Sequence, residues 1–306
     1  MEDTEQLATL LRAIGDPSRL RLLHALEQGE LTVSEMTEVT GLSQPRVSRH
    51  LKLLCDARLL RRARDQNEVY YRANTDEERR TLVEQTLDAL SPEDPYVTQD
   101  ESRLRIILDK RRTRAAELLA ELGIKPMDSQ TADDVAAMVK SLFGASLGVA
   151  ALTDTSLGRL LDIGTGTGTM LHMLAPFAEH VVAVDHSRDM RLVARTSALA
   201  DGLANCTVQD GDMFALSFAD SAFDTITMDR VLGVAGRARE AVAEAGRVLR
   251  PGGRLLIVET SLSGVDERIL VGWLRTIGLT GVEIRRSTDG LAFIALAKSP
   301  EAPQTN

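Results

Sequence analysis

The spacing of apolar residues changes along the chain and divides it into three parts. In residues 1–90, apolar positions recur at the spacing of short helices and end in two β-type runs. Residues 101–122 and 132–143 repeat the helical spacing among many charged residues. From residue 156 to about 299, β-type runs such as RLLDI, HVVAVD and FDTITM alternate with helical segments. This alternation predicts a parallel sheet with crossover helices.

Breaks in the pattern mark the expected domain boundaries. The segment SPEDPYVTQD at residues 91–100 combines prolines with acidic residues and reads as a linker. We therefore predict an N-terminal domain at residues 1–90, a helical linker at 91–154, an α/β domain at 155–299 and a disordered tail at 300–306. The 306 residues and 43% hydrophobic content suit a multidomain chain with a core in each globular part.

Capping signals place the helices of the N-terminal part. Asp16 precedes Pro17, which is the pattern of an N-cap followed by a proline in the first helical turn. A short second helix at residues 33–39 is closed by Gly41. Ser43 begins a third helix with one apolar stripe, formed by Val47, Leu51 and Leu54. Two helices joined by such a short turn are typical of a helix-turn-helix.

Basic residues concentrate in this part although the chain is acidic. The net charge is −9 at pH 7, yet residues 43–72 carry eight arginines and lysines against three acidic residues. The runs RRAR and VYYRA flank residues 65–68, which predicts a β-hairpin whose tip forms a wing. A solvated face is the simpler interpretation of exposed arginines, but the cap, turn and hairpin in register favour DNA contact. The predicted DNA-binding residues are Gln44, Arg46, Ser48, Arg49, Lys52, Arg62 and Arg64.

Three segments of the N-terminal part together resemble the ArsR family of winged-helix repressors: GDPSRLRLLHAL, SQPRVSRHLKLLCDARLL and VYYRA. The resemblance implies an α+β winged helix-turn-helix that binds a palindromic double-stranded DNA operator as a homodimer. It also implies that the first helix and a helix at about residues 76–90 pack at the dimer interface. Metal-sensing members carry a cysteine pair on the helix before the recognition helix, but here that helix reads VSEMTEV. No metal site is therefore predicted there.

A glycine-rich turn follows the first strand of the C-terminal part. In LLDIGTGTGT, three glycines lie between a strand and a helix, where such turns bind dinucleotides and S-adenosylmethionine alike. The GxGxG spacing leaves less room for a pyrophosphate than GxGxxG does. Asp185 ends the next strand and is suited to ribose hydroxyls, whereas Asp212, followed by Met213, is suited to an adenine amine.

In this order, these pieces resemble class I S-adenosylmethionine-dependent methyltransferases, which have an α/β Rossmann-like fold. The resemblance implies S-adenosylmethionine or S-adenosylhomocysteine as the cofactor. It assigns the ribose to Asp185, the adenine to Asp212 and Met213, and the methionine moiety to Asp162, Gly164, Gly166 and Gly168. A tight turn without a ligand and an NAD site are the alternatives.

The sequence assigns no catalytic residue. After the fourth strand the chain reads MDRVLGVAG, which lacks the D/N/S-P-P-Y/F motif of base amino-methylation and a Pro-Cys nucleophile, so DNA methylation is not expected. Cys206 is the only cysteine of this part, so arsenite methylation is not expected either. The short TSLSG segment leaves a minimal lid, and a substrate pocket would come from residues 101–150 and the loop 229–236. Arg230 could hold an anionic substrate, although an ordinary surface position is the simpler interpretation.

Cysteine usage and the N-terminus indicate a cytoplasmic protein. Cys55 and Cys206 fit neither a disulfide framework nor zinc-ligand spacing, and Cys55 reads as a small core residue. The acidic N-terminus lacks the features of a signal peptide, and no stretch is apolar enough to span a membrane.

Two functions fit this sequence. In the first, the chain is a transcriptional regulator whose methyltransferase-like domain binds a small-molecule ligand and modulates operator binding. In the second, it is an active small-molecule methyltransferase with an autoregulatory DNA-binding domain. Catalytic accumulation of the demethylated cofactor would favour the enzyme, whereas stoichiometric binding alone would favour the sensor.

Overall fold

The computed structural model describes residues 4–74, 77–124, 129–149, 152–153, 156–260 and 263–301. The chain forms two compact units. The first contains Met1–Leu118 and Arg195–Thr207, and the second contains Leu119–Ala194 and Val208–Asn306. The domain division at residues 90 and 154 stays a prediction. Most of the predicted tail, from residue 302 onward, lies outside the described residues.

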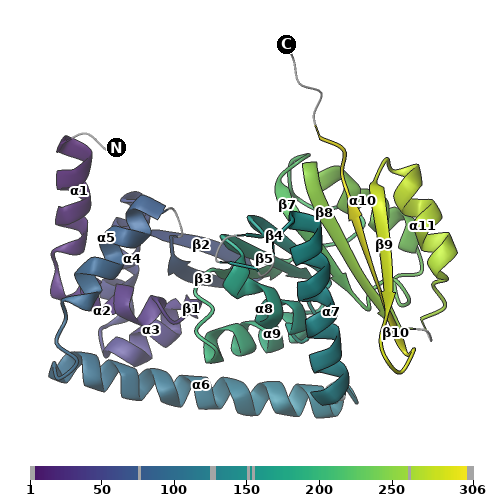
Figure 1. Ribbon diagram of the computed structural model, residues 1–306. Helices are drawn as coiled ribbons and strands as arrows, with labels where there is room; N and C mark the ends of the chain where they lie inside the picture. The colour runs from purple at the N-terminus through teal and green to yellow at the C-terminus, as the bar shows by residue number, and fades with distance from the viewer. Residues whose placement is uncertain are drawn as a thin grey trace. The chain divides into compact units, whose positions relative to one another are not determined.

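Four short helices begin the first unit: α1 (Thr4–Ile14), α2 (Pro17–Leu26), α3 (Val33–Thr40) and α4 (Gln44–Asp56) (Figure 1). The Asp16 carboxylate caps α2 as predicted, since its Oδ1 accepts from the backbone N–H groups of Ser18 and Arg19 at 2.9 and 3.1 Å. Gly41 ends α3 with φ +66°, a left-handed conformation that favours glycine. This sharp turn directs the chain into α4.

A three-stranded antiparallel sheet completes this part of the first unit. It consists of β1 (Leu31–Thr32), β3 (Glu68–Ala73) and β2 (Leu60–Asp65), in that spatial order. Asp65 pairs with Glu68, so the hairpin tip is the two-residue turn Gln66-Asn67 and is shorter than the four residues predicted. The hairpin itself lies where the RRAR and VYYRA runs predict it.

Two further helices follow, α5 (Glu77–Asp88) and α6 (Pro95–Glu121). Helix α6 begins six residues earlier than the predicted residue 101, inside the segment read as a linker. The reason is local: Asp94 Oδ1 accepts from the backbone N–H groups of Tyr96 and Val97 at 2.8 and 3.2 Å, and Pro95 occupies the first turn. The proline therefore begins a helix here instead of excluding one. Leu104 and Ile107 of α6 join the apolar core of the first unit.

The second unit alternates strands and helices after α7 (Ser129–Leu147). The strands are β4 (Arg159–Ile163), β5 (His180–Asp185), β6 (Cys206–Asp210), β7 (Phe223–Asp229), β8 (Leu249–Thr260), β9 (Thr280–Arg286) and β10 (Ala292–Lys298). The helices are α8 (Thr169–Leu174), the short 3-10 helix η1 (Ala175–Phe177), α9 (Arg188–Ala200), α10 (Ala238–Val248) and α11 (Glu267–Thr276).

The strands form one seven-stranded sheet in the order β6-β5-β4-β7-β8-β10-β9. β4 pairs in parallel with β5 and β7, and β7 pairs in parallel with β8, as predicted. β10, however, runs antiparallel to both β8 and β9, so the sheet is mixed and the prediction of a parallel sheet is wrong at this edge. Residues 287–291 are too short for a crossover connection, so β9 and β10 form a hairpin.

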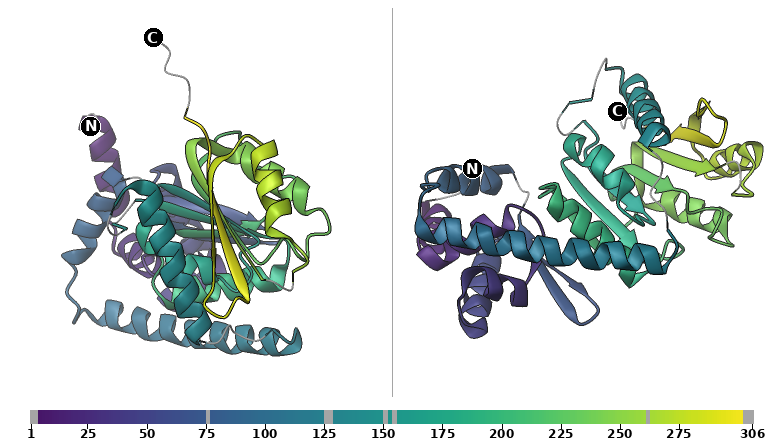
Figure 2. Two further views of the ribbon diagram at one scale, coloured as in Figure 1. Left: turned by 45° about the vertical axis from the view of Figure 1, so that its right-hand side comes forward. Right: turned by 90° about the horizontal axis from the view of Figure 1, so that it is seen from below.

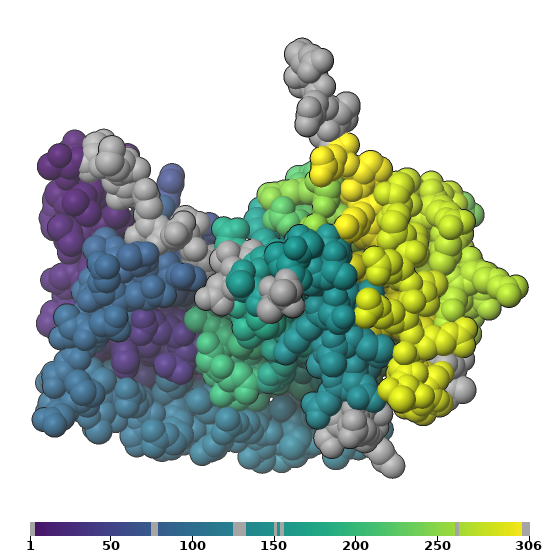
Figure 3. Space-filling view, viewed as in Figure 1, coloured from purple at the N-terminus to yellow at the C-terminus, as the bar shows by residue number. Residues whose placement is uncertain are grey.

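Helices cover the sheet and bury its apolar strands. α10 packs against β8 and α11 packs against β9, and their apolar side chains share one core with β4, β7 and β8. α7 packs against β10 and reaches the surface beside it (Figures 2 and 3). The strand order reverses direction at β4, between β5 and β7. In open α/β sheets, ligands bind outside the carboxyl ends of the strands at such a switch point.

Candidate functional site

A cavity of about 770 Å³ lies at the switch point of the sheet, within the second unit. Its walls come from the carboxyl ends of four strands and the segments after them: residues 164–167 and 169 after β4, 185–187 and 190 at the end of β5, 211–214 after β6, and 229–231, 234 and 235 at the end of β7. Ile124 completes the lining. The volume falls within the range of about 300–1,000 Å³ that small-molecule pockets occupy.

The glycine turn after β4 needs glycine at each of the three predicted positions. Gly164, Gly166 and Gly168 have φ of +69°, +52° and +87°, values that side chains rarely adopt. A Cβ on Gly164 would lie 2.4 Å from Cγ1 of Val231, on the loop after β7. The turn is also anchored, because the backbone N–H groups of Gly164 and Thr165 donate to the Val184 carbonyl at 2.8 and 3.0 Å.

Asp185 lies at the end of β5, as predicted, and it borders the pocket. Its Oδ2 accepts from the Gly166 N–H at 2.9 Å, and its Oδ1 accepts from the Ser187 N–H at 2.8 Å. Each carboxylate oxygen can still accept a further hydrogen bond, which is the capacity that a ribose would use. The buried Arg191 fixes the strand ends, since its Nη1 donates to the Asp185 carbonyl at 2.9 Å and to Asp210 Oδ1 at 2.8 Å.

The two residues predicted to hold adenine also border the pocket. Asp212 is exposed, and its Oδ1 accepts from the Phe214 N–H at 2.9 Å, which orients the carboxylate locally. Met213 is partly buried and packs against the core of the second unit. A polar acceptor next to a polarizable thioether suits one edge and one face of a heteroaromatic ring.

Asp162 and Gly168, the two other predicted cofactor residues, lie beneath the lining. Asp162 is buried, and its Oδ1 accepts from the Thr227 hydroxyl at 2.7 Å. Burial raises the pKa of Asp162 to about 6, and the negative charges of Asp229 and Asp185 act in the same direction. Gly168 is the N-cap residue of α8. These two residues support the turn from below, whereas the remaining five predicted residues border the cavity.

The sequence did not predict several residues that line the pocket, and it favoured an ordinary surface position for Arg230, which also lines it. Thr165 and Thr167 lie between the glycines, Thr169 follows the last of them, and Ser187 and Met190 follow Asp185. Their positions in the sequence could have predicted them, because all of them follow the carboxyl end of a parallel strand, where ligands bind in open α/β sheets.

The loop after β7 is held by two contacts with β8. The backbone N–H of Arg230 donates to the Val258 carbonyl at 2.7 Å. The buried Glu259 accepts from the Leu232 N–H through its Oε1 at 2.7 Å, and burial raises the pKa of this carboxyl group. Arg230 also has φ +55°, a conformation that is uncommon for a residue with a long side chain. The loop conformation is therefore fixed by its neighbours.

A polar surface lies on α4 of the first unit. Val47, Leu51 and Leu54 are fully buried, which confirms the predicted apolar stripe. The opposite side of the helix is exposed and carries Gln44, Arg46, Ser48, Arg49 and Lys52. Ser43 precedes the helix without forming a side-chain cap. On β2, Arg62 and Arg64 are exposed, and Arg64 Nε donates to the Gln66 carbonyl at 3.0 Å across the hairpin tip.

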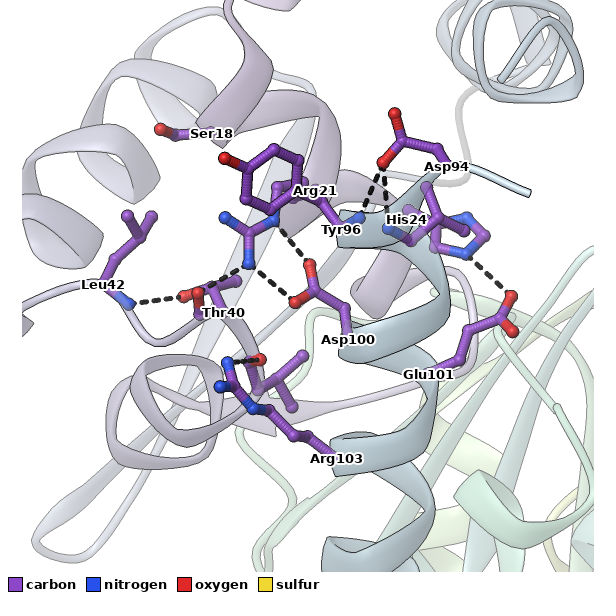
Figure 4. Close-up of polar contacts among 12 residues, drawn as sticks. Ser18, Arg21, His24, Thr40, Leu42, Asp94, Tyr96, Asp100, Glu101 and Arg103 are labelled. Atoms are coloured by element: carbon purple, nitrogen blue, oxygen red, sulfur yellow. Dashed lines mark hydrogen bonds and ion pairs between the residues drawn. The ribbon is translucent and has the colours of Figure 1, made fainter. Parts of the chain in front are cut away.

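Arginines of α2 and α6 brace the helix that precedes this surface. Arg21 Nε and Nη2 each donate to the Asp100 carboxylate at 2.6 Å, and Nη2 also donates to the Thr40 carbonyl at 2.5 Å, at the end of α3 (Figure 4). Arg111 makes the corresponding pair with Glu35, at 2.6 Å for both contacts. Both pairs fix α3 and thus the turn into α4.

Among the described residues, no group of three or more His, Cys, Asp or Glu side chains could hold a metal ion. No helix in the same residues is long and apolar enough to cross a membrane. Within the part of the chain that the structure describes, neither Cys55 nor Cys206 forms a disulfide, and Cys55 is half-buried.

Comparison with known proteins matches two families on this chain. Residues 16–62 match the family described as "Bacterial regulatory protein, arsR family", and residues 161–257 match the family described as "Methyltransferase domain".

Relatives and a solved structure agree with the second match. The demethylmenaquinone methyltransferase of Renibacterium salmoninarum is 31% identical over 201 residues, covering 65% of this chain and 81% of that protein. The ubiquinone/menaquinone biosynthesis C-methyltransferase UbiE of Dinoroseobacter shibae is 43% identical over 107 residues, covering 34% of this chain and 42% of that protein. The crystal structure of the CurJ carbon methyltransferase is 14% identical with a TM-score of 0.50, covering 98% of this chain and 94% of that chain, and shows the fold alone.

The fold and the site define a class I methyltransferase domain with a mixed, Rossmann-like sheet. The chain belongs to the methyltransferase family and carries an arsR-family helix-turn-helix domain in its N-terminal part. Its methyltransferase domain binds S-adenosylmethionine or S-adenosylhomocysteine. The site fits this cofactor for two reasons. The three glycines of the turn carry no side chains that would fill the pocket, and the Asp185 carboxylate oxygens can each accept a further hydrogen bond.

Proposed function

We propose that this chain is a cytoplasmic transcriptional regulator that binds a DNA operator and whose bound cofactor changes its affinity for that operator. One observation carries the proposal: α4 has a fully buried apolar face and an exposed face with two guanidinium groups. A helix with this division of faces fits the major groove of B-DNA. The same chain also contains a formed small-molecule pocket.

Each exposed residue of this surface has a proposed role. Arg46 and Arg49 of α4 contact base edges, and Gln44 and Ser48 lie near the N-terminal end of the helix, which enters the groove first. Lys52 and the hairpin arginines, Arg62 and Arg64, are proposed phosphate contacts that set the register on the duplex without reading sequence. The β2–β3 hairpin thereby serves as a wing.

A second copy of the chain completes the proposed DNA-binding form. Leu7 and Leu11 of α1 lie one helical turn apart and are 45% and 51% exposed, whereas Leu10 and Ile14 of the same helix are buried. Two exposed leucines on one helical stripe suit an isologous contact between two α1 helices. A twofold dimer of this kind matches a palindromic operator.

Helix α9 contributes residues to both units, and we propose that it couples ligand binding to the hairpin. Its residues 188–194 belong to the second unit and its residues 195–200 to the first. Met190 lines the pocket. Within the first unit, Arg195 is buried and donates to Asp65 Oδ2 of β2 at 2.7 Å and to Glu30 Oε2 at 3.2 Å. A ligand that shifts the first turn of α9 would therefore act on a helix whose last turns hold the hairpin strand.

A catalytic role is the second candidate, in which the chain methylates a small molecule and regulates genes through the same N-terminal part. Its support is the pocket, which extends beyond the predicted cofactor residues to the loop 229–235, together with the methyltransferase names of the relatives. Methyl transfer depends mainly on alignment of the acceptor and exclusion of water, because the sulfonium cofactor supplies the chemistry.

Two measurements on the full-length protein separate these functions. Operator titration at fixed salt, with and without saturating S-adenosylmethionine or S-adenosylhomocysteine, tests regulation. Incubation of the protein with S-adenosylmethionine and a metabolite extract tests catalysis, through formation of S-adenosylhomocysteine beyond one equivalent. A ligand-dependent change in operator affinity without such turnover would support the sensor alone. Turnover without any change in operator affinity would support the enzyme alone.

A further inference from the structure

Arg230 presents an unused hydrogen-bonding edge at the pocket. Its Nε donates to Asp229 Oδ1 at 2.9 Å and its Nη2 donates to Asp229 Oδ2 at 2.8 Å. This contact occupies one edge of the planar guanidinium group. The other edge, formed by one N–H of Nη1 and the second N–H of Nη2, has no hydrogen-bond acceptor among the residues that the structure describes. Two parallel N–H groups of this kind match the two oxygens of a carboxylate.

The backbone of Arg230 holds this edge in place. The residue has φ +55°, and its N–H is bonded to Val258 on the neighbouring strand. A long, branched-headed side chain in this region of backbone space persists only where the surroundings fix it. The side chain is 36% exposed, so the guanidinium group remains accessible while it stays paired. Strained backbone of this kind, next to a cavity, points to a role in ligand binding.

Apolar side chains line the same pocket as this edge. Val234 is 84% exposed although it is apolar, and Ile124 is partly exposed on another segment of the lining. Val231, Met213 and Phe214 add further apolar surface to the wall. Exposed apolar residues around a single convergent polar group are typical of a small-molecule site with one charged anchor.

Two carboxylates of the pocket, Asp185 and Asp229, already accept hydrogen bonds from the protein. Asp229 is paired with Arg230 through both of its oxygens, and the Asp185 oxygens accept from backbone N–H groups. A ligand carboxyl group has an ordinary pKa of about 4, so it would meet the open guanidinium edge as a carboxylate at neutral pH. The hydrogen bond to Asp229 raises the pKa of Arg230, so the anchor stays cationic throughout the physiological range.

We propose that Arg230 anchors the carboxylate of an apolar small molecule that occupies the pocket beside the cofactor. The inference shares with the second candidate function only the premise that this pocket takes a small molecule besides the cofactor. It assigns the class of that molecule: an apolar body with one carboxylate, held bidentately by Nη1 and Nη2. Asp229 is a positioning residue, because it sets the plane of the guanidinium group and competes with the ligand for its charge.

The test uses two probes that share one apolar body, 2-naphthoate and 2-naphthamide. Binding of each is measured by calorimetry to the full-length protein saturated with S-adenosylhomocysteine. The wild type should bind naphthoate about tenfold or more tightly than naphthamide, the ratio expected when a charge-assisted bidentate contact is lost. Arg230→Asn should remove this preference, and asparagine suits the left-handed backbone of this position. Asp229→Asn should strengthen naphthoate binding, because the side chain keeps one oxygen that can accept from Nε while the competing charge is removed.

Arg268→Asn is the matched control, since Arg268 is an exposed arginine of α11 outside the pocket lining. It should leave both probes unchanged. S-adenosylhomocysteine affinity and the thermal midpoint, measured for each variant, show whether the fold and the cofactor site remain intact. Equal binding of the two probes to the wild type, or an unchanged preference in Arg230→Asn, would overturn the inference. If naphthoate binds through Arg230 but no ligand changes operator affinity, the regulatory proposal fails and this inference stands.

Discussion

Arginine–carboxylate pairs serve different purposes in the two units. In the first unit, Arg21 pairs with Asp100 and uses its remaining Nη2 N–H for the Thr40 carbonyl, and its side chain is only 14% exposed. In the second unit, Arg230 forms the same kind of pair with Asp229, but its outer edge has no acceptor among the described residues and it faces a cavity. The residue types and distances are similar, and the difference lies in which edge of the guanidinium group is left open.

This contrast separates arginines that hold the fold from arginines that are available to a ligand. We call an arginine closed when protein acceptors occupy its guanidinium group beyond one carboxylate pair, as for Arg21, and open when an edge is left for a ligand. Arg111 is closed, since it pairs with Glu35 and also donates to the Glu30 carbonyl at 3.3 Å. Arg46 and Arg49 on the exposed face of α4 are likewise accessible to a ligand, without a carboxylate pair in the described contacts. Substitution of a closed arginine should therefore reduce stability, whereas substitution of an open arginine should reduce binding and leave stability nearly unchanged.

The largest effect is expected for Arg21→Ala. The substitution leaves the buried Asp100 carboxylate without its partner and the end of α3 without a donor. Removing one member of a buried pair costs about 3–5 kcal/mol of unfolding free energy. Urea unfolding monitored by circular dichroism would measure this loss. Arg80→Ala is the matched control, because Arg80 forms a half-exposed pair with Glu84 within α5. A similar midpoint in both variants would contradict the closed role of Arg21.

The double variant Arg46→Ala, Arg49→Ala should abolish specific DNA binding while the urea midpoint, the oligomeric state and cofactor affinity stay at wild-type values. Each lost base contact costs about 1–3 kcal/mol of binding free energy. Competition between operator and random DNA in a gel-shift titration at fixed salt measures the loss of specificity. Wild-type operator affinity in this variant would refute the placement of α4 in the groove.

The sequence predicts the α4 surface better than the pocket because the two depend on different kinds of information. The stripe Val47, Leu51 and Leu54 follows from periodicity within a single helix, and the structure confirms it. The open edge of Arg230 depends on the loop after β7 and on its contact with Val258 of β8, which no local pattern encodes. The antiparallel β10 and the early start of α6 were missed for related reasons, a short hairpin connection and an Asp94 cap.

Asp185→Ala should weaken S-adenosylmethionine binding. The substitution removes the two acceptor oxygens at the end of β5 and also the partner of the Gly166 N–H in the glycine turn. Loss of such hydrogen bonds costs about 1–3 kcal/mol. Calorimetry with S-adenosylmethionine measures the change, and Asp189→Ala on the exposed side of α9 is the control. Wild-type affinity in Asp185→Ala would mean that the cofactor lies elsewhere.

Asp162 gives the second unit a pH dependence of comparable size. Burial raises the pKa of this carboxyl group to about 6 in the folded protein, above its unfolded value of 3.8. Between these two values the folded state binds more protons than the unfolded state, so stability falls as pH rises from about 4 to 6. A shift of this kind corresponds to about 1–3 kcal/mol. Urea midpoints of the wild type and Asp162→Asn across this range measure it, and an unchanged pH profile in the variant would contradict the assignment.

The smallest expected effect is the coupling between cofactor binding and operator binding. It tests the proposal that ligand binding changes operator affinity through Arg195 and its partners Glu30 and Asp65. A ligand shifts operator affinity only if it binds the DNA-competent and DNA-incompetent arrangements with different affinities. Typical couplings are about 1–3 kcal/mol, and we expect the lower end, about a fivefold change in operator affinity. Linkage requires the operator to change cofactor affinity by the same factor, so both titrations must agree at one salt concentration.

The variant Arg195→Lys tests the role of α9. Lysine keeps the positive charge between Glu30 and Asp65 but lacks the planar guanidinium group that contacts both. The variant should reduce the coupling to less than about twofold, while cofactor binding and DNA binding each persist. Undiminished coupling in Arg195→Lys would exclude α9 as the route, and an operator affinity that no ligand changes in the wild type would mean that the two parts of the chain act independently.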